Sequence, residues 1–187
     1  MSQQELLALV VQTLERCEIP YFVTGSWSSS LQGEPRSTHD LDVVVALTSA
    51  QISNLLDAFP ADRFYVSERA VQDAIRARTM FNVLNTQTGD KVDFWILTED
   101  PWDQTRLARR VRESVFGTDV DISSPEDTII AKLRWAKLSG GSQKQMNDAR
   151  GVFEVQAGSL DTTYIETWSQ RLGLTELWHE IRDLPND

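Results

Sequence analysis

Two aspartates separated by a single leucine stand at the head of an apolar run over residues 40–45, Asp-Leu-Asp-Val-Val-Val. Because side chains alternate along a β-strand, Asp40 and Asp42 are expected to project from one face, with Cα atoms ~6.5 Å apart. Two carboxylates in such positions repel each other, and a bound divalent cation would relieve that repulsion. A third acid, Asp93, interrupts the apolar run 91–97, where it is costly unless it is paired, hydrogen-bonded or metal-bound.

Hard oxygen ligands of this number favour Mg²⁺ or Mn²⁺ over zinc, and a chain with one cysteine and two histidines offers no competing cluster. Two such cations can clamp the attacking and leaving oxygens of an in-line phosphoryl displacement. Asp93 is expected either to complete the metal site or to deprotonate the incoming hydroxyl. An Asp-x-Asp pair alone is weak evidence, since solvated strand ends carry it too, so neighbouring residues must support the site.

Upstream of the paired acids, Gly25 and Ser26 follow the apolar run 21–24. This Gly-Ser pair predicts a turn from a buried strand into a short helix that ends at about Leu31. The N–H groups at a helix start have no partner within the helix and suit phosphate oxygens. The Gly-Ser turn and the three strand-borne carboxylates are the sharpest functional signal in the sequence.

The elements that must position these residues follow from hydrophobic periodicity. Leucines and valines at helical spacing predict a helix over 2–17, and apolar runs predict strands over 21–24 and 41–47. Two further runs, 79–86 and 91–98, predict an antiparallel hairpin with Asp93 on its second arm. The other elements expected in this half are helices over 48–59 and 68–77 and from residue 101, and short strands over 64–66, 112–116 and 120–122.

From Ser124 onward the pattern is wholly helical, with helices expected over 124–139, 142–157, 161–172 and 175–183. Ser142 and Gln145 have the spacing of a capping box, which predicts a helix start. The expected fold class is therefore α/β (α+β), with a mixed sheet in a domain over 1–122 and a helical bundle over 123–187. Trp168 and Trp178 are expected in the core of that bundle.

Composition limits the classes of protein that fit. The 187 residues are 41% hydrophobic and include six tryptophans, enough to form one compact domain or one with a smaller attachment. A net charge of −10 argues against broad binding to nucleic acid or to an anionic membrane. A single cysteine, no basic signal-peptide start and no apolar run of about 20 residues predict a cytoplasmic protein without a membrane span.

The segment 33–42, Gly-Glu-Pro-Arg-Ser-Thr-His-Asp-Leu-Asp, together with Gly25-Ser26 and Asp93, resembles the nucleotidyltransferase superfamily related to DNA polymerase β. It is particularly similar to the abortive-infection type IV toxin branch. Ser124-Pro125-Glu126-Asp127 and Lys144-x-x-x-Asp148 resemble the later helical motifs of that branch. The resemblance covers about residues 20–180 and implies a mixed-sheet nucleotidyltransferase fold with a C-terminal helical bundle.

The resemblance also implies roles for individual residues. A nucleoside triphosphate (NTP) would bind at Gly25, Ser26, Arg36 and Thr38, with Ser26 at its terminal phosphates. Mg²⁺ or Mn²⁺ would bind at Asp40, Asp42 and Asp93. The catalytic set would be Asp40, Asp42, Asp93, Lys132 and Asp148. Trp27 departs from the pattern, because many relatives carry a small residue after the Gly-Ser pair.

Lys132 and Asp148 are also expected to interact on simple physical grounds. Asp148 falls on the inward face of its helix with Val152 and Val155, and a buried acid needs a partner. Lys132 borders the apolar face of the preceding helix and is the obvious candidate. The alternative is a lysine whose stem covers the core edge while its amine stays in water.

The leading hypothesis is a metal-dependent enzyme that moves a nucleoside monophosphate from an NTP to a hydroxyl and releases pyrophosphate. One alternative is a catalytically silent module of the same fold that binds a nucleotide or a partner protein. Another is an enzyme that modifies a small molecule such as an aminoglycoside. The resemblance further raises a role as the toxin of a toxin–antitoxin pair, with an antitoxin protein as partner.

Local charge suggests that the acceptor is the end of a tRNA or another structured RNA. Residues 104–150 are net basic, with six acids against nine cations: Arg106, Arg109, Arg110, Arg112, Lys132, Arg134, Lys137, Lys144 and Arg150. An RNA backbone would be drawn to such a stretch, with a steep dependence on salt. The alternative is that these cations simply pair with neighbouring acids on solvated faces.

Overall fold

The computed structural model describes residues 1–35 and 40–183, and these form two compact units. The first unit comprises the described residues of Met1–Val23 and Thr38–Ile122, and the second those of Thr24–Ser37 and Ser123–Asp187. The domain boundary expected after residue 122 stays a prediction. Of the residues expected in the first domain, the described residues 24–35 belong to the second unit, with the later helices.

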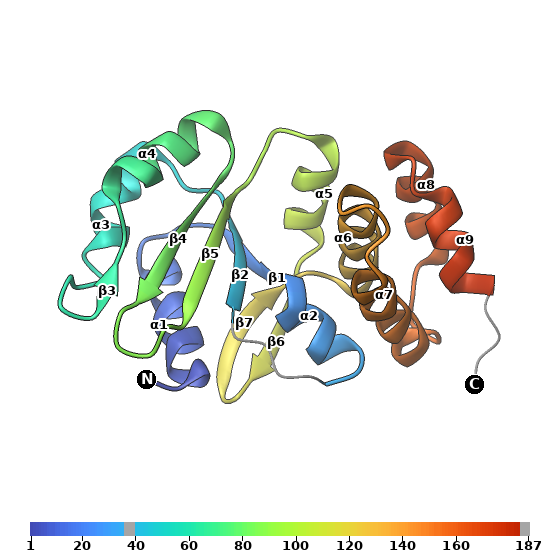
Figure 1. Cartoon of the computed structure of the whole chain (residues 1–187), viewed down its shortest axis with the longest axis horizontal. Coiled ribbons are helices and arrows are strands. Elements are labelled where there is room, and N and C mark those ends of the chain that lie inside the picture. Colours follow the sequence, from blue (N-terminus) through green and yellow to red (C-terminus); the bar gives the residue numbers. More distant parts are fainter. Residues whose placement is uncertain (36–39, 184–187) are drawn as a thin grey trace. The chain divides into compact units, whose positions relative to one another are not determined.

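A mixed sheet is the centre of the first unit. Its described strands are β1 (Tyr21–Thr24), β2 (Asp40–Val45), β3 (Phe64–Tyr65), β4 (Met80–Asn85), β5 (Lys91–Ile96), β6 (Val111–Val115) and β7 (Thr118–Ile122). They lie in the order β3-β4-β5-β2-β1-β7-β6 (Figure 1). β2 pairs with β5 in parallel, whereas β4 with β5 and β6 with β7 are antiparallel hairpins. The expected mixed sheet, the hairpin that carries Asp93 and the short edge strand β3 are confirmed.

Helices accompany the sheet in the same unit. They are α1 (Gln3–Arg16), the 3₁₀ turn η1 (Ser49–Gln51), α3 (Ile52–Leu56), α4 (Glu68–Ala77) and α5 (Pro101–Arg109). Thr48 and Gln51 form a capping box, but it opens a 3₁₀ turn before a short α3. The helix expected over 48–59 is therefore shorter and less regular than its pattern suggested.

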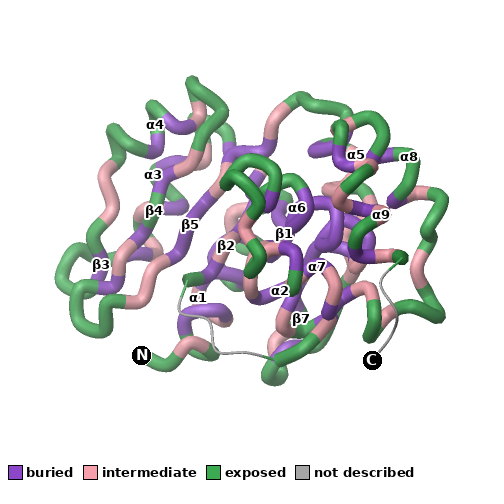
Figure 2. The backbone as a smooth tube through the Cα atoms, turned by 45° about the vertical axis from the view of Figure 1, so that its right-hand side comes forward, coloured by how far each residue is buried: buried purple, intermediate pink, exposed green. Residues whose placement is uncertain are grey.

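Strand alternation gives β2 and β5 one apolar face. On β5, Val92, Phe94 and Ile96 are each at most 3% exposed, and Phe94 stacks on Phe81 with ring centroids 5.0 Å apart. Phe59 meets Phe94 edge-on, with centroids 6.3 Å apart. Figure 2 shows β5 largely buried, in contrast to the exposed loops around it. This apolar face anchors the strands whose other face carries the acids.

The second unit is helical. It contains α2 (Gly25–Gln32), α6 (Pro125–Leu138), α7 (Gln143–Gln156), α8 (Thr162–Leu172) and α9 (Thr175–Asp183). α2 packs on α6 and α7, while α8 packs on α6 and α9 on α7. Gly33, after α2, lies so close to α7 that a Cβ there would stand 2.8 Å from the backbone nitrogen of Val152.

Side-chain hydrogen bonds reinforce that close packing of α2. The amide of Gln32 donates to the Ser123 carbonyl over 2.6 Å, and the amide of Gln156 donates to the Gln32 carbonyl over 3.0 Å. Buried Trp168 and Trp178 confirm the expected bundle core. The helix expected after Ser142 is present as α7, although Ser142 makes no side-chain cap among the described residues of that helix. The expectation that Val155 faces inward was wrong, because it is 59% exposed.

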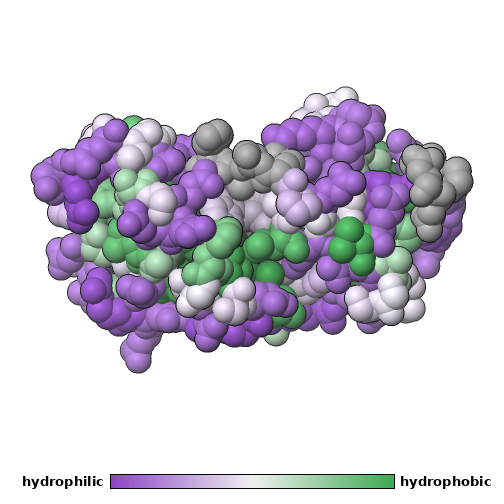
Figure 3. Space-filling model, turned by 90° about the horizontal axis from the view of Figure 1, so that it is seen from below, coloured by the Kyte–Doolittle hydropathy of each residue, from purple (hydrophilic) through white to green (hydrophobic). Residues whose placement is uncertain are grey.

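The face of the molecule drawn in Figure 3 is mainly hydrophilic. Charged residues make up 25% of the chain, and Figure 3 shows hydrophilic side chains over most of the face it presents, with smaller apolar groups between them. No helix in the described part of the chain is long and apolar enough to cross a membrane.

We expect Tyr21 to make the stability of the fold sensitive to alkaline pH. Burial raises the pKa of Tyr21 to about 12, and its hydroxyl accepts a hydrogen bond from the N–H of Asp121. Because the unfolded chain ionises first, near pH 10, the contribution of Tyr21 is fully present below pH 10. It then falls by up to about 1.4 kcal/mol per pH unit as the pH rises toward 12.

Urea unfolding of the wild type and of Tyr21→Phe at pH 8 and pH 11 would measure this effect. The difference in unfolding free energy between the two proteins should shrink at pH 11. Tyr65→Phe, which changes an exposed tyrosine, serves as the control. An unchanged difference between wild type and Tyr21→Phe at the two pH values would contradict the burial of the Tyr21 hydroxyl.

Candidate active site

The pairing of β2 with β5 brings the three predicted carboxylates onto one face of the sheet. In this parallel ladder Asp42 lies directly opposite Asp93, and Asp40 lies opposite Lys91. Neighbouring strands are about 4.8 Å apart, and residues opposite each other in a parallel pair project from the same face. Asp40 is exposed, Asp42 is half-buried, and Asp93 is buried with 8% of its surface exposed.

The opposite face of the same strands explains this register. Leu41 and Val43 alternate with the acids of β2, as Val92 and Phe94 do on β5, and all four are buried. A slip of one residue would move the apolar side chains out of the core and an aspartate into it. The hydrophobic core therefore fixes the positions of the carboxylates.

Two residues that the sequence interpretation did not single out contact the carboxylates. The Nζ of Lys91 lies 2.9 Å from Asp93 Oδ2 and 3.6 Å from Asp40 Oδ2. The hydrogen bond to Asp93 is the main cause of a raised pKa for Lys91. Trp95 donates from Nε1 to Asp42 Oδ1 over 3.3 Å. The signal was present in the sequence, because Lys91, Asp93 and Trp95 alternate along β5.

The donor set suits a hard divalent cation, although the side chains do not enclose one as they stand. Within the described ranges, no three acidic, histidine or cysteine residues are grouped closely enough to hold a metal ion. Lys91 engages two of the carboxylates and Trp95 the third. Asp93 Oδ1, however, is buried without a hydrogen-bond partner among the described atoms. Three carboxylates on one face, with one oxygen unsatisfied, are hard oxygen donors of the kind that Mg²⁺ or Mn²⁺ prefers.

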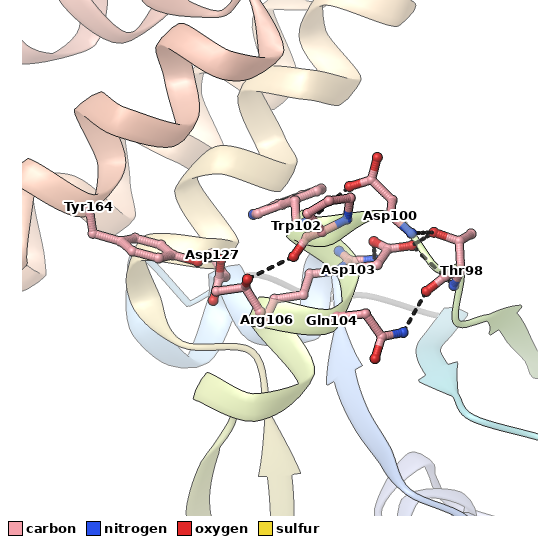
Figure 4. Close-up of polar contacts among 10 residues, drawn as sticks. Thr98, Asp100, Trp102, Asp103, Gln104, Arg106, Asp127 and Tyr164 are labelled. Atoms are coloured by element: carbon pink, nitrogen blue, oxygen red, sulfur yellow. Dashed lines mark hydrogen bonds and ion pairs between the residues drawn. The ribbon is translucent and has the colours of Figure 1, made fainter.

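The helix α5 is anchored at the end of β5. The Asp103 carboxylate accepts hydrogen bonds from the backbone and the hydroxyl of Thr98, and Asp100 caps the helix through the N–H of Trp102 (Figure 4). Leu107 of α5 then packs with Trp95 against the cluster formed by Phe22, Val44 and Leu97. This packing fixes the tryptophan that contacts Asp42.

The predicted Gly-Ser turn lies at the start of α2 in the helical unit. Gly25 has a φ of +68°, a left-handed conformation that favours glycine at this position. Thr24, at the N-cap, forms no side-chain cap with the described first turn. Trp27 is buried within α2. The other two residues expected to bind the nucleotide, Arg36 and Thr38, fall outside the described residues.

Lys132 and Asp148 form the predicted pair. Lys132 Nζ lies 2.7 Å from Asp148 Oδ2, and the two side chains are 4% and 9% exposed. The interpretation of Lys132 as a residue at the edge of the core was wrong, because the whole residue is buried. In the same unit, buried Asp127 accepts hydrogen bonds from Ser124 and Tyr164, the latter drawn in Figure 4. Any catalytic role of Lys132 and Asp148 stays a prediction.

Most of the basic residues that were expected to attract RNA form ion pairs with acidic residues. Five of the nine have an acidic partner among the described residues: Arg106 with Asp103, Arg110 with Asp121, Arg112 with Glu15 and Asp121, Lys132 with Asp148, and Arg150 with Glu154. This pattern is the simpler alternative considered from the sequence, in which the cations neutralise neighbouring acids.

Residues 6–131 match the sequence pattern of the aminoglycoside-2″-adenylyltransferase family, which is more than half of the chain. The chain belongs to this family. Its expected membership of the nucleotidyltransferase superfamily is thereby confirmed, as is its assignment to the nucleotidyltransferase enzymes. The finer resemblance to the abortive-infection type IV branch stays a prediction. No curated protein matches the sequence significantly.

Solved structures share the fold of this adenylyltransferase-family chain. An antigenic nucleotidyltransferase-like protein from Paracoccidioides brasiliensis matches with a TM-score of 0.63 and 18% identity, over 97% of this chain and 88% of the other. ANT(2″)-Ia in complex with adenylyl-2″-tobramycin matches with a TM-score of 0.59 and 14% identity, over 92% of this chain and 97% of the other. These likenesses confirm the expected nucleotidyltransferase fold.

We expect Asp42→Asn to stabilise the metal-free protein while removing metal-dependent NTP binding. Asp42 and Asp93 are like charges directly opposite each other, an arrangement that destabilises a strand pair by about 0.2–1 kcal/mol. Asparagine keeps an oxygen that can accept the hydrogen bond from Trp95. Thermal unfolding with and without Mg²⁺, and NTP calorimetry, would measure both effects. Asp119→Asn, at an exposed strand aspartate, is the matched control. Unchanged NTP affinity in Asp42→Asn would rule out a metal site at Asp42.

We expect the buried Lys132–Asp148 pair to show strong coupling. Removal of one partner takes this ion pair away from a charge that stays buried, and breaking a buried pair in this way costs about 3–5 kcal/mol. Lys132→Met and Asp148→Asn should therefore each lower the free energy of unfolding. The sum of the two losses should exceed the loss in the double variant. A double-mutant cycle by chemical unfolding should give an interaction of about 0.5–3 kcal/mol. Strict additivity would mean that the two charges act independently.

Proposed function

We propose that this chain transfers a nucleoside monophosphate, most simply AMP, from an NTP to a hydroxyl group of a small amino-sugar acceptor of the aminoglycoside type. The proposal rests on the carboxylate face of β2 and β5 and on the family match over residues 6–131. It replaces RNA with a small acceptor as the leading hypothesis, whereas the reaction type is unchanged.

In the proposed reaction, the acceptor hydroxyl oxygen forms a bond to the α-phosphorus of the NTP. The bond from that phosphorus to its bridging oxygen breaks, and pyrophosphate leaves. The hydroxyl proton passes to Asp93, whose buried Oδ1 has no described hydrogen-bond partner. Asp93 is placed for this role because it lies directly opposite Asp42, on the face of the sheet that carries all three carboxylates.

Asp40 and Asp42 are proposed to hold Mg²⁺ or Mn²⁺, with Asp93 as the third carboxylate of the set. A divalent ion there would neutralise phosphate charge and orient the NTP. Gly25 and Ser26, at the start of α2, are proposed to receive the terminal phosphates, since backbone N–H groups at a helix start favour anions.

Charge favours a small cationic acceptor over RNA. The net charge of −10 repels a polyphosphate backbone but attracts a molecule with several protonated amino groups. The local excess of arginine and lysine does not reverse this, because most of the cations concerned have acidic partners. These ion pairs reduce the positive charge that could attract an RNA backbone.

The test is to incubate the protein with each of the four NTPs, Mg²⁺ and either tobramycin or total tRNA. Pyrophosphate release and the mass of the acceptor would be measured. The wild type should add a nucleotide to the aminoglycoside in a metal-dependent reaction, and Asp93→Asn should lose at least about 100-fold in rate, as expected for removal of a general base. Asp119→Asn should retain the wild-type rate.

Nucleotide transfer to tRNA but not to aminoglycosides would overturn the proposed acceptor and favour the abortive-infection resemblance. In that case charge reversal at Arg109 and Arg110 should weaken RNA modification without weakening NTP binding. Binding of NTP without transfer to either acceptor would favour the catalytically silent module.

A further inference from the structure

The ammonium group of Lys91 lies beside the three carboxylates. Lys91 projects from the same face as the acids, because it lies two residues before Asp93 on β5 and opposite Asp40 on β2. Its Nζ lies within 2.9 Å of Asp93 Oδ2 and 3.6 Å of Asp40 Oδ2. The Lys91 side chain is 33% exposed, so its amine can move into solvent without crossing the core.

Charge balance explains why a lysine is useful in this position. Three carboxylates on one sheet face repel one another, and Asp42 and Asp93 are direct neighbours across the ladder. One ammonium group shared by Asp93 and Asp40 lowers this repulsion without filling the coordination shell of a metal. Asp93 Oδ1 accordingly remains buried without a hydrogen bond from any described residue.

We propose that Lys91 is a built-in counter-cation, which stabilises the carboxylate face before a metal binds and must be displaced when a divalent cation enters. This inference rests on the proposed function, because it presumes that Asp40, Asp42 and Asp93 receive the cation. Lys91 is thus a positioning residue that sets metal affinity by competition. It does not itself touch the reacting atoms.

Displacement of Lys91 would release the carboxylates of both Asp40 and Asp93. The amine contacts Asp40, a proposed metal ligand, and Asp93, the proposed acceptor of the hydroxyl proton. While Lys91 stays in place, one oxygen of each carboxylate is engaged by the ammonium group. Metal entry would therefore release both carboxylates together and couple cation binding to the readiness of the general base.

The test measures Mn²⁺ affinity by calorimetry in the absence of nucleotide. Lys91→Met removes the charge and keeps a similar chain length, whereas Lys91→Arg keeps the charge. We expect Lys91→Met to bind Mn²⁺ about tenfold more tightly than the wild type and Lys91→Arg to remain within about threefold. Lys144→Met, at an exposed lysine of α7, makes the same change in net charge and should leave the affinity unchanged.

Thermal unfolding supplies a second readout. Metal-free Lys91→Met should melt at a lower temperature than the wild type, because the three acids lose their counter-ion, and saturating Mg²⁺ should remove most of that difference. In the wild type, the NMR signal of the Lys91 side chain should shift when Mg²⁺ is added. A signal that does not respond while metal binds elsewhere on the face would overturn the displacement.

The outcomes separate this inference from the proposed function. Equal Mn²⁺ affinity in the wild type and Lys91→Met, with loss of binding in Asp42→Asn, would overturn the role of Lys91 and leave the metal site intact. Absence of binding in the wild type and in every Lys91 variant would overturn the metal site and this inference together.

Discussion

The parallel pairing of β2 with β5 is the interaction on which the site depends. It sets Asp42 opposite Asp93 and Asp40 opposite Lys91, and nothing local to either strand could do so. The pairing is held by the other face, where Phe94 is fully buried and stacks on Phe81. The molecule thus uses the stability of its aromatic core to hold like charges together on the opposite side of the same strands.

Much of the fold followed from local patterns in the sequence. The strand at 21–24, the hairpin that carries Asp93 and the helices after Ser124 were predictable, because apolar periodicity and capping residues act over a few positions. The capping boxes show the limit of such patterns. Thr48 and Gln51 form one, whereas Ser142, with the same spacing, makes no side-chain cap to the described α7.

The three acids of the candidate site could be singled out from the sequence, but their contacts could not. Which residue faces which depends on the register between strands that are distant in sequence, and single-sequence patterns carry little information about it. The contacts of Lys91 with Asp93 and Asp40 were therefore not predicted, although Lys91 lies two residues from Asp93. Charge counts misled for a related reason: Arg112 appeared available in the sequence, yet it pairs with Glu15 from α1.

The helical unit is assembled from two separate stretches of chain, since α2 is inserted between two strands of the sheet but packs with α6 and α7. Gly33 tightens this arrangement, because its approach to the α7 backbone leaves no room for a side chain. The Gly-Ser turn and α2 therefore cannot be transferred between relatives without the helices on which α2 packs. Recombination that exchanged the region after Ile122 between relatives would separate α2 from the helices shaped to receive it. Functional chimeras would have to inherit both stretches from one parent.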